Sequence, residues 1–148
     1  MNAKAKLQQL GACTDAIDWI GDRTIEQAWR ECRRSDWMLW LLRLVAPNDH
    51  RCRLAAADFA ERVWNLIDNE PARRTAAWAI GAARRGDANE MMAAATASAS
   101  FYAASDAASY AATYAAERAA QADILRGYFT PREIAKLLDA AIAKEGER

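Results

Sequence analysis

Residues 35–45 read SDWMLWLLRLV, and a helix with this sequence carries apolar side chains on nearly every side. Only Arg43 interrupts the apolar surface before Pro47. Such a helix must be surrounded by other elements, and it is too short to cross a bilayer, which needs about 20 apolar residues. The stretch therefore predicts a central core helix capped by Ser35 or Asp36, with a partner-binding face or an interfacial membrane helix as the alternatives. Its expected core residues are Trp37, Met38, Trp40, Leu41, Leu42, Leu44 and Val45.

Glycine and proline divide the rest of the chain into short segments with helical periodicity. No segment alternates apolar and polar residues at period two, so we expect no strands. A length of 148 residues with short connections predicts one all-α domain, 1–148, built as a bundle of about seven or eight helices. We find no sequence repeat, although loosely stacked helical hairpins are compatible with the pattern. The dividing residues are Gly11, Gly21, Pro47, Pro71, Gly86, Gly127 and Pro131.

The N-terminal region contains two helices with clear apolar faces, after a first helix at roughly 3–10. The second helix is expected at roughly 12–20. The third begins at Thr24, which forms a predicted capping box with Gln27. Apolar residues at i, i+3, i+4 and i+7 are typical of a packed helix face. The faces consist of Cys13, Ala16, Ile17 and Ile20 in the second helix, and of Ile25, Ala28, Trp29 and Cys32 in the third.

A helix at roughly 49–68 follows the core helix. Asn48 or Asp49 provides its expected N-cap. On its polar side, Asp58 and Arg62 have the i, i+4 spacing of an ion pair. Its expected buried residues are Cys52, Ala56, Phe59, Val63, Leu66 and Ile67.

Two further helices and an alanine-rich stretch complete the chain. A proline opens the helix predicted at 71–85, and Gly86 is its expected C-cap. Because alanine is the best helix former, the stretch 88–127 predicts one long central helix, or two nearly collinear ones, in place of disorder. Thr130 and Glu133 form a capping box at the start of the last helix. The expected inward residues are Ala72, Ala76, Ala79, Ile80 and Ala83, then Ile134, Leu137, Leu138 and Ala141.

Charge and cysteine content exclude several classes of function. The formal net charge is zero and the pI is about 6.6, so the chain lacks the basic excess that DNA, RNA or an anionic bilayer attracts. The first residues lack the apolar core of a signal peptide. Three widely spaced cysteines do not make a disulfide framework. We therefore expect a cytoplasmic protein that binds neither nucleic acid nor membrane.

No local motif for catalysis or metal binding is present. Cys13, Cys32, His50 and Cys52 are residue types that bind zinc, but their spacing is poor and each cysteine fits a buried helix face. The chain has no G-x-S-x-G turn and no glycine-rich phosphate loop. We expect no cofactor and no enzymatic activity. An enzyme assembled from dispersed residues remains an alternative.

Two groups of residues are candidates for recognition of a protein partner. Acidic residues recur on the polar side of the second helix and beyond it, where a solvated face is the alternative interpretation. Tyrosines recur every four or eight residues in the alanine-rich stretch, where burial with the hydroxyl bonded to Asp106 is the alternative. Tyrosine is favoured at interfaces because it brings a large, rigid, amphipathic surface. The candidates are Asp15, Asp18, Asp22 and Glu26 in the first group and Tyr102, Tyr110 and Tyr114 in the second.

The stretches GACTDAIDW, AWRECRRSDWMLWL and AAERAAQADILRGYF resemble small all-helical bacterial and prophage proteins described as candidate immunity proteins of polymorphic toxin systems. The resemblance covers nearly the whole chain and is most specific at residues 36–41. One departure is Ala120, where the family pattern has a large aromatic residue. The resemblance implies a protein that neutralises a toxin by binding it. A phage-encoded inhibitor that binds a bacterial defence system is the alternative within the same class.

Overall fold

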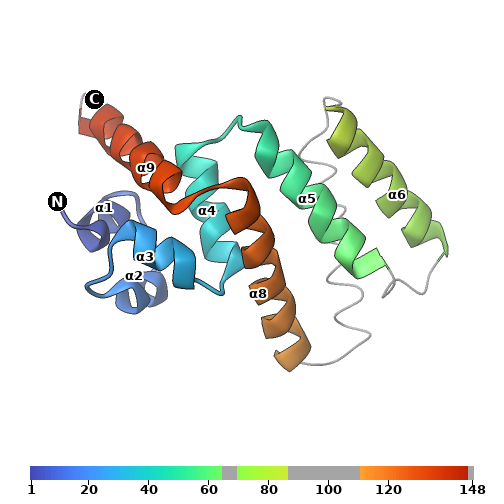
Figure 1. Ribbon diagram of the computed structural model, residues 1–148, viewed down its shortest axis with the longest axis horizontal. Helices are drawn as coiled ribbons and strands as arrows, with labels where there is room; N and C mark the ends of the chain where they lie inside the picture. The colour runs from blue at the N-terminus through green and yellow to red at the C-terminus, as the bar shows by residue number, and fades with distance from the viewer. Residues whose placement is uncertain (65–69, 87–110, 147–148) are drawn as a thin grey trace.

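The computed structural model describes residues 1–64, 70–86 and 111–146, and the regular elements in these ranges are α-helices (Figure 1). No strand occurs among the described residues, which confirms the predicted all-α fold class. The helices are α1 (Ala3–Gln9), α2 (Thr14–Ile20), α3 (Ile25–Glu31), α4 (Ser35–Val45), α5 (His50–Val63), α6 (Glu70–Arg85), α8 (Ala111–Tyr128) and α9 (Pro131–Gly146).

The helices pack around one main core. The helix α9 lies against α1, α3 and α4, while α4 also contacts α8 (Figure 1). On the other side of the molecule α5 packs against both α8 and α6. A small second cluster forms between α5 and α6, where Ala57 and Ala83 are buried and Ile80 packs on them. The largest fully buried side chains of the main core are Ile20, Leu42, Leu125, Phe129, Ile134 and Leu138.

The helix α4 is a core helix, as its sequence predicts, but it is not buried on all sides. Met38, Leu41 and Leu42 are buried, whereas the tryptophans are half-buried against the core. Leu44 is 43% exposed, so its predicted burial is wrong. It lies two positions after Leu42, which places it about 200° around the helix from that buried residue.

The predicted N-caps are correct at three helices and wrong at one. Thr24 and Gln27 form the capping box of α3, and Thr130 and Glu133 exchange the same pair of bonds at the start of α9. Asp49 caps α5 by accepting from the backbone N–H of Arg51. Neither Ser35 nor Asp36 caps α4. Both lie inside its first turn, and the preceding Arg34 occupies the N-cap position without a side-chain cap.

Long-range partners explain that missing cap. The Ser35 hydroxyl donates to Oε1 of Gln121 on α8 at 2.9 Å. Asp36 accepts two hydrogen bonds from the Arg34 guanidinium and lies 3.9 Å from Arg118. Burial raises the pKa of Asp36, but the Arg34 hydrogen bond and both positive charges outweigh it and hold the pKa below its ordinary value. These side chains attach α4 to α8 instead of closing the helix end.

The predicted Asp58–Arg62 ion pair is wrong. Asp58 instead accepts from Arg84 on α6 at 3.1 Å and from the Tyr128 hydroxyl at 2.6 Å. Arg62 donates to Glu117 on α8 at 3.1 Å. Both side chains therefore bridge to neighbouring helices, which offer partners that the spacing along α5 does not reveal.

The three cysteines have different surroundings. Cys32 is buried as predicted, and Cys52 is half-buried against the core. Cys13 is exposed, which corrects its predicted place on the buried face of the second helix. The reason is that α2 begins only at Thr14, so Cys13 is the extended N-cap residue before it.

Several predictions fall partly or wholly outside the described residues. They include the burial of Leu66 and Ile67 and most of the long alanine-rich helix, of which only α8 is described, ending at Tyr128. The side chains of α6 at 72, 76 and 79 are likewise outside the described part of the structure. Gly86 has the positive φ of +75° expected of a C-cap. In α9, Ile134 and Leu138 are buried while Leu137 and Ala141 are half-buried. Within the described ranges, no helix has both the length and the hydropathy needed to cross a membrane.

Candidate partner-binding site

The predicted acidic residues lie along α2 and the start of α3. Asp15 and Asp18 are exposed on α2, and Glu26 is half-buried in the first turn of α3. Asp22 is also exposed, but it lies in the turn after α2 and not on the helix face predicted for it. Gly21 makes this turn with a φ of +51°, a conformation that glycine adopts readily. We call Asp15, Asp18, Asp22 and Glu26 the acidic face.

The acidic face is distinguished by its lack of neutralising partners. Within the described ranges, none of its four carboxylates has an ion-pair or hydrogen-bond partner. Every other described aspartate and glutamate makes a polar or electrostatic interaction. The four unpaired acids therefore follow one another in the sequence with no other acidic residue between them, and they lie on α2, the turn after it and the start of α3.

The nearest arginine does not neutralise the acidic face. Arg23 is the only basic residue between positions 13 and 29. Its guanidinium donates to the Trp19 carbonyl at 2.6 Å and to Glu31 at 2.8 Å, and it lies 4.8 Å from the centre of the Trp19 ring. None of these contacts is with the acidic face, so Arg23 forms no ion pair with the four acids.

An apolar pocket lies next to this face. It has a volume of about 60 Å³, opens to solvent, and is lined by side chains from α1 to α4 and the segments between them. Four tryptophans contribute to it, namely Trp19, Trp29, Trp37 and Trp40. We call it the tryptophan pocket.

Three of the tryptophans that line the tryptophan pocket make specific contacts. The Trp19 and Trp37 rings lie 5.9 Å apart at 55° to each other. Arg34 stacks over Trp37 at 4.3 Å, much as Arg23 stacks over Trp19. The Trp29 indole N–H donates to the Phe129 carbonyl at 2.9 Å, which satisfies its polar group inside the core. These contacts position Trp19, Trp29 and Trp37 around the pocket.

The tryptophan pocket contains almost no polar atoms. Its one thiol, Cys32, donates to the Arg34 carbonyl at 3.6 Å. Burial raises the pKa of the Cys32 thiol, so this side chain is a neutral apolar group at physiological pH. The pocket is suited to an apolar group and offers no nucleophile.

The predicted tyrosine line cannot be placed. Tyr102 and Tyr110 lie outside the described residues. Tyr114 belongs to α8, but its side chain is also outside the described part of the structure. Tyr128 is described, and its hydroxyl donates to Asp58. This hydrogen bond, together with burial, raises the pKa of Tyr128 to about 12. Its role is to join α8 to α5.

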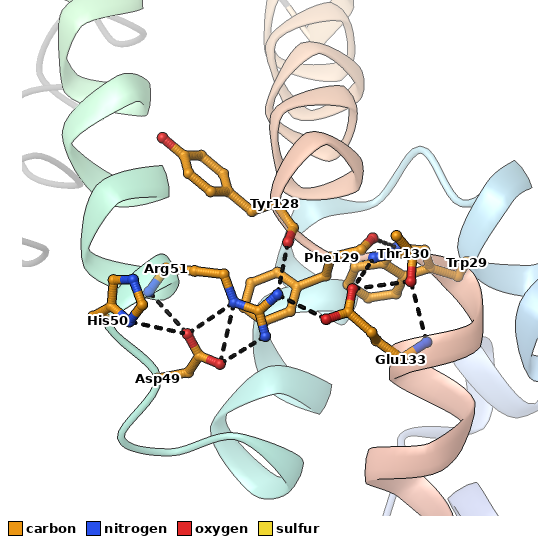
Figure 2. A network of polar contacts seen from close by, with 8 residues as sticks. All are labelled: Trp29, Asp49, His50, Arg51, Tyr128, Phe129, Thr130 and Glu133. Carbon is orange, nitrogen blue, oxygen red and sulfur yellow. Dashed lines mark hydrogen bonds and ion pairs between the residues drawn. The ribbon is translucent and has the colours of Figure 1, made fainter.

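A second polar cluster, around Arg51, joins three helices (Figure 2). Arg51 pairs with Asp49 at 2.9 Å and with Glu133 at 3.0 Å, and it also donates to the Tyr128 carbonyl at 3.0 Å. Its guanidinium lies 4.2 Å from the centre of the Phe129 ring. The Thr130 backbone N–H and the Arg51 hydrogen bond lower the pKa of Glu133 to about 2. The cluster fixes the turn between α8 and α9 against α5.

Of the residues in the zinc hypothesis, His50 and Cys52 both lie on α5. His50 is largely exposed beside Asp49 at the start of α5 (Figure 2). Cys52 lies two positions further along the helix, and residues at i and i+2 do not face each other. No group of three or more metal-binding side chains occurs in the described part of the chain.

Comparisons with protein-family models, curated proteins and solved structures found no match to this chain.

Proposed function

We propose that this protein is a non-enzymatic binding factor whose acidic face docks on a basic surface of another protein. The observation that carries the proposal is that Asp15, Asp18, Asp22 and Glu26 lack partners within the described residues, while the other described acids do not. Like charges at helical spacing destabilise a helix by a few tenths of a kcal/mol per pair. Asp15 and Asp18, three positions apart on α2, form such a pair, and a basic partner would relieve their repulsion.

The biological role that fits this chemistry best is neutralisation of a toxin. A toxin that acts on nucleic acid needs a positively charged cleft to hold phosphates. An acidic face accelerates encounter with such a cleft and covers it once bound. The resemblance of the sequence to candidate immunity proteins supports the same role. A gene for a basic toxin next to the gene for this chain would add independent support.

The test is affinity capture from the native host with matched charge variants. The tagged wild type should recover a protein with a basic surface, and Asp15→Lys/Asp18→Lys should lose it. The control Glu61→Lys/Glu70→Lys changes the net charge equally on α5 and α6, where both acids are exposed and form surface ion pairs of small energy. This control should retain the partner. Equal recovery by both variants, or recovery of no protein, would refute the proposal.

A further inference from the structure

The tryptophan pocket is small and lined by apolar side chains. For comparison, an apolar protein cavity of about 150 Å³ binds benzene. At about 60 Å³ the pocket is well below that size, so it suits a few methyl or methylene groups better than an aromatic ring. A bound water needs two or more polar partners, and the one thiol in the lining already donates to the Arg34 carbonyl. The pocket therefore favours an aliphatic group over water.

The same helix forms part of the tryptophan pocket and part of the acidic face. Ala16 and Trp19 of α2 line the pocket. Asp15 precedes Trp19 by four positions, so the two side chains are neighbours on the helix surface. A partner segment that places an aliphatic side chain in the pocket would therefore bring its adjacent residues next to the unpaired carboxylate of Asp15.

We propose that the tryptophan pocket receives the branched end of one leucine side chain from a basic segment of the partner. This inference rests on the proposed function and specifies an anchor beside the acidic face. Charge selects the segment, because lysine or arginine beside the leucine neutralises Asp15, the neighbour of Trp19 on α2. Pocket size selects the anchor, because an aromatic side chain is too large and alanine leaves the space empty.

The size of the pocket sets the expected preference. Empty cavity space costs about 24 cal/mol per Å³. Filling the pocket's volume of about 60 Å³ corresponds to about a tenfold gain in affinity. We therefore expect the leucine form of a basic peptide to bind about tenfold more tightly than its alanine form.

The experiment uses two synthetic peptides, acetyl-Lys-Lys-Leu-Lys-Lys-amide and the same peptide with alanine at its centre. Binding to the full chain is followed through the tryptophan indole N–H signals in NMR titrations. The wild type should prefer the leucine peptide, with the largest shifts at Trp19 and Trp37. The variant Ala16→Leu, which fills the pocket from α2, should abolish the preference. The matched control Ala140→Leu, at an exposed position of α9, should keep it.

Each outcome is decisive. Equal affinity of the two peptides for the wild type, or no measurable binding of either, overturns the inference without reference to any variant. A leucine preference that survives in Ala16→Leu, with an unchanged melting temperature, also overturns it. If affinity capture recovers a partner that depends on Asp15 and Asp18 while the leucine preference is absent, the proposed function stands and the pocket inference falls. If the leucine peptide is preferred but no partner is captured, the proposed function falls alone.

Discussion

Truncation of two leucines on the same helix tests the orientation of α4. Leu42 is 1% exposed and belongs to the main core, whereas Leu44, two residues later, is 43% exposed. Leu→Ala in a packed core costs about 2–5 kcal/mol because a cavity remains. A surface substitution usually changes the free energy of unfolding by less than about 0.5 kcal/mol. We expect about 3–4 kcal/mol for Leu42→Ala and about 0.5 kcal/mol for Leu44→Ala.

The assay is thermal and urea unfolding followed by far-UV circular dichroism. For a chain of this size, 1 kcal/mol corresponds to about 2–4 °C in melting temperature. Leu42→Ala should therefore lower the melting temperature by about 6–16 °C, and Leu44→Ala by no more than about 2 °C. The two substitutions remove the same atoms from the same helix, so the change in helix propensity is the same in both variants and cancels in the comparison. Equal losses of stability would refute the assignment of Leu42 to the core and of Leu44 to the surface.

Two further predictions concern titration and thiol exposure. The pKa of Glu133 is about 2 in the folded protein and about 4.3 in the unfolded chain, so the ionised side chain stabilises the fold fully above the unfolded value and loses this effect as pH falls toward about 2. The variant Glu133→Gln should therefore flatten the acid side of a plot of urea midpoint against pH. An unchanged slope would contradict this prediction. Cys13 is exposed, whereas Cys32 is buried and its pKa is raised. A thiol reagent should therefore label Cys13 in the folded protein and Cys32 only on unfolding, as read by peptide mass spectrometry. Simultaneous labelling would show that the reagent enters the tryptophan pocket.

Local features of the fold could be predicted from the sequence. The capping boxes at Thr24 and Thr130 depend only on residues within one turn, and both are present. The buried face of α3 follows from its spacing and is also confirmed. In these cases the interactions that decide the structure lie within about four positions of each other, where helix geometry fixes the neighbours.

Features that depend on contacts between helices could not be predicted. Asp58 has Arg62 at ion-pair spacing, yet Arg84 of α6 and Tyr128 reach it instead. Ser35 forms a hydrogen bond with Gln121, which is 86 positions away. The tryptophan pocket is built from α1 to α4 and the segments between them, so only the unusual number of tryptophans in this region hinted at it. The acidic residues were visible in the sequence, but their lack of partners became apparent only in the fold.

The most direct test of the proposed function is the association rate of the captured partner at two ionic strengths. Wild type, Asp15→Lys/Asp18→Lys and Glu61→Lys/Glu70→Lys should melt within a few degrees of one another, since all four acids are exposed. Electrostatic steering accelerates association by about tenfold or more at low salt. It fades at about 1 M salt, where the Debye length is about 3 Å. We predict that the Asp15/Asp18 reversal slows association about tenfold at low salt and little at high salt, while the control matches wild type. An unchanged association rate for the Asp15/Asp18 reversal at low salt would contradict the proposal that the acidic face docks the partner.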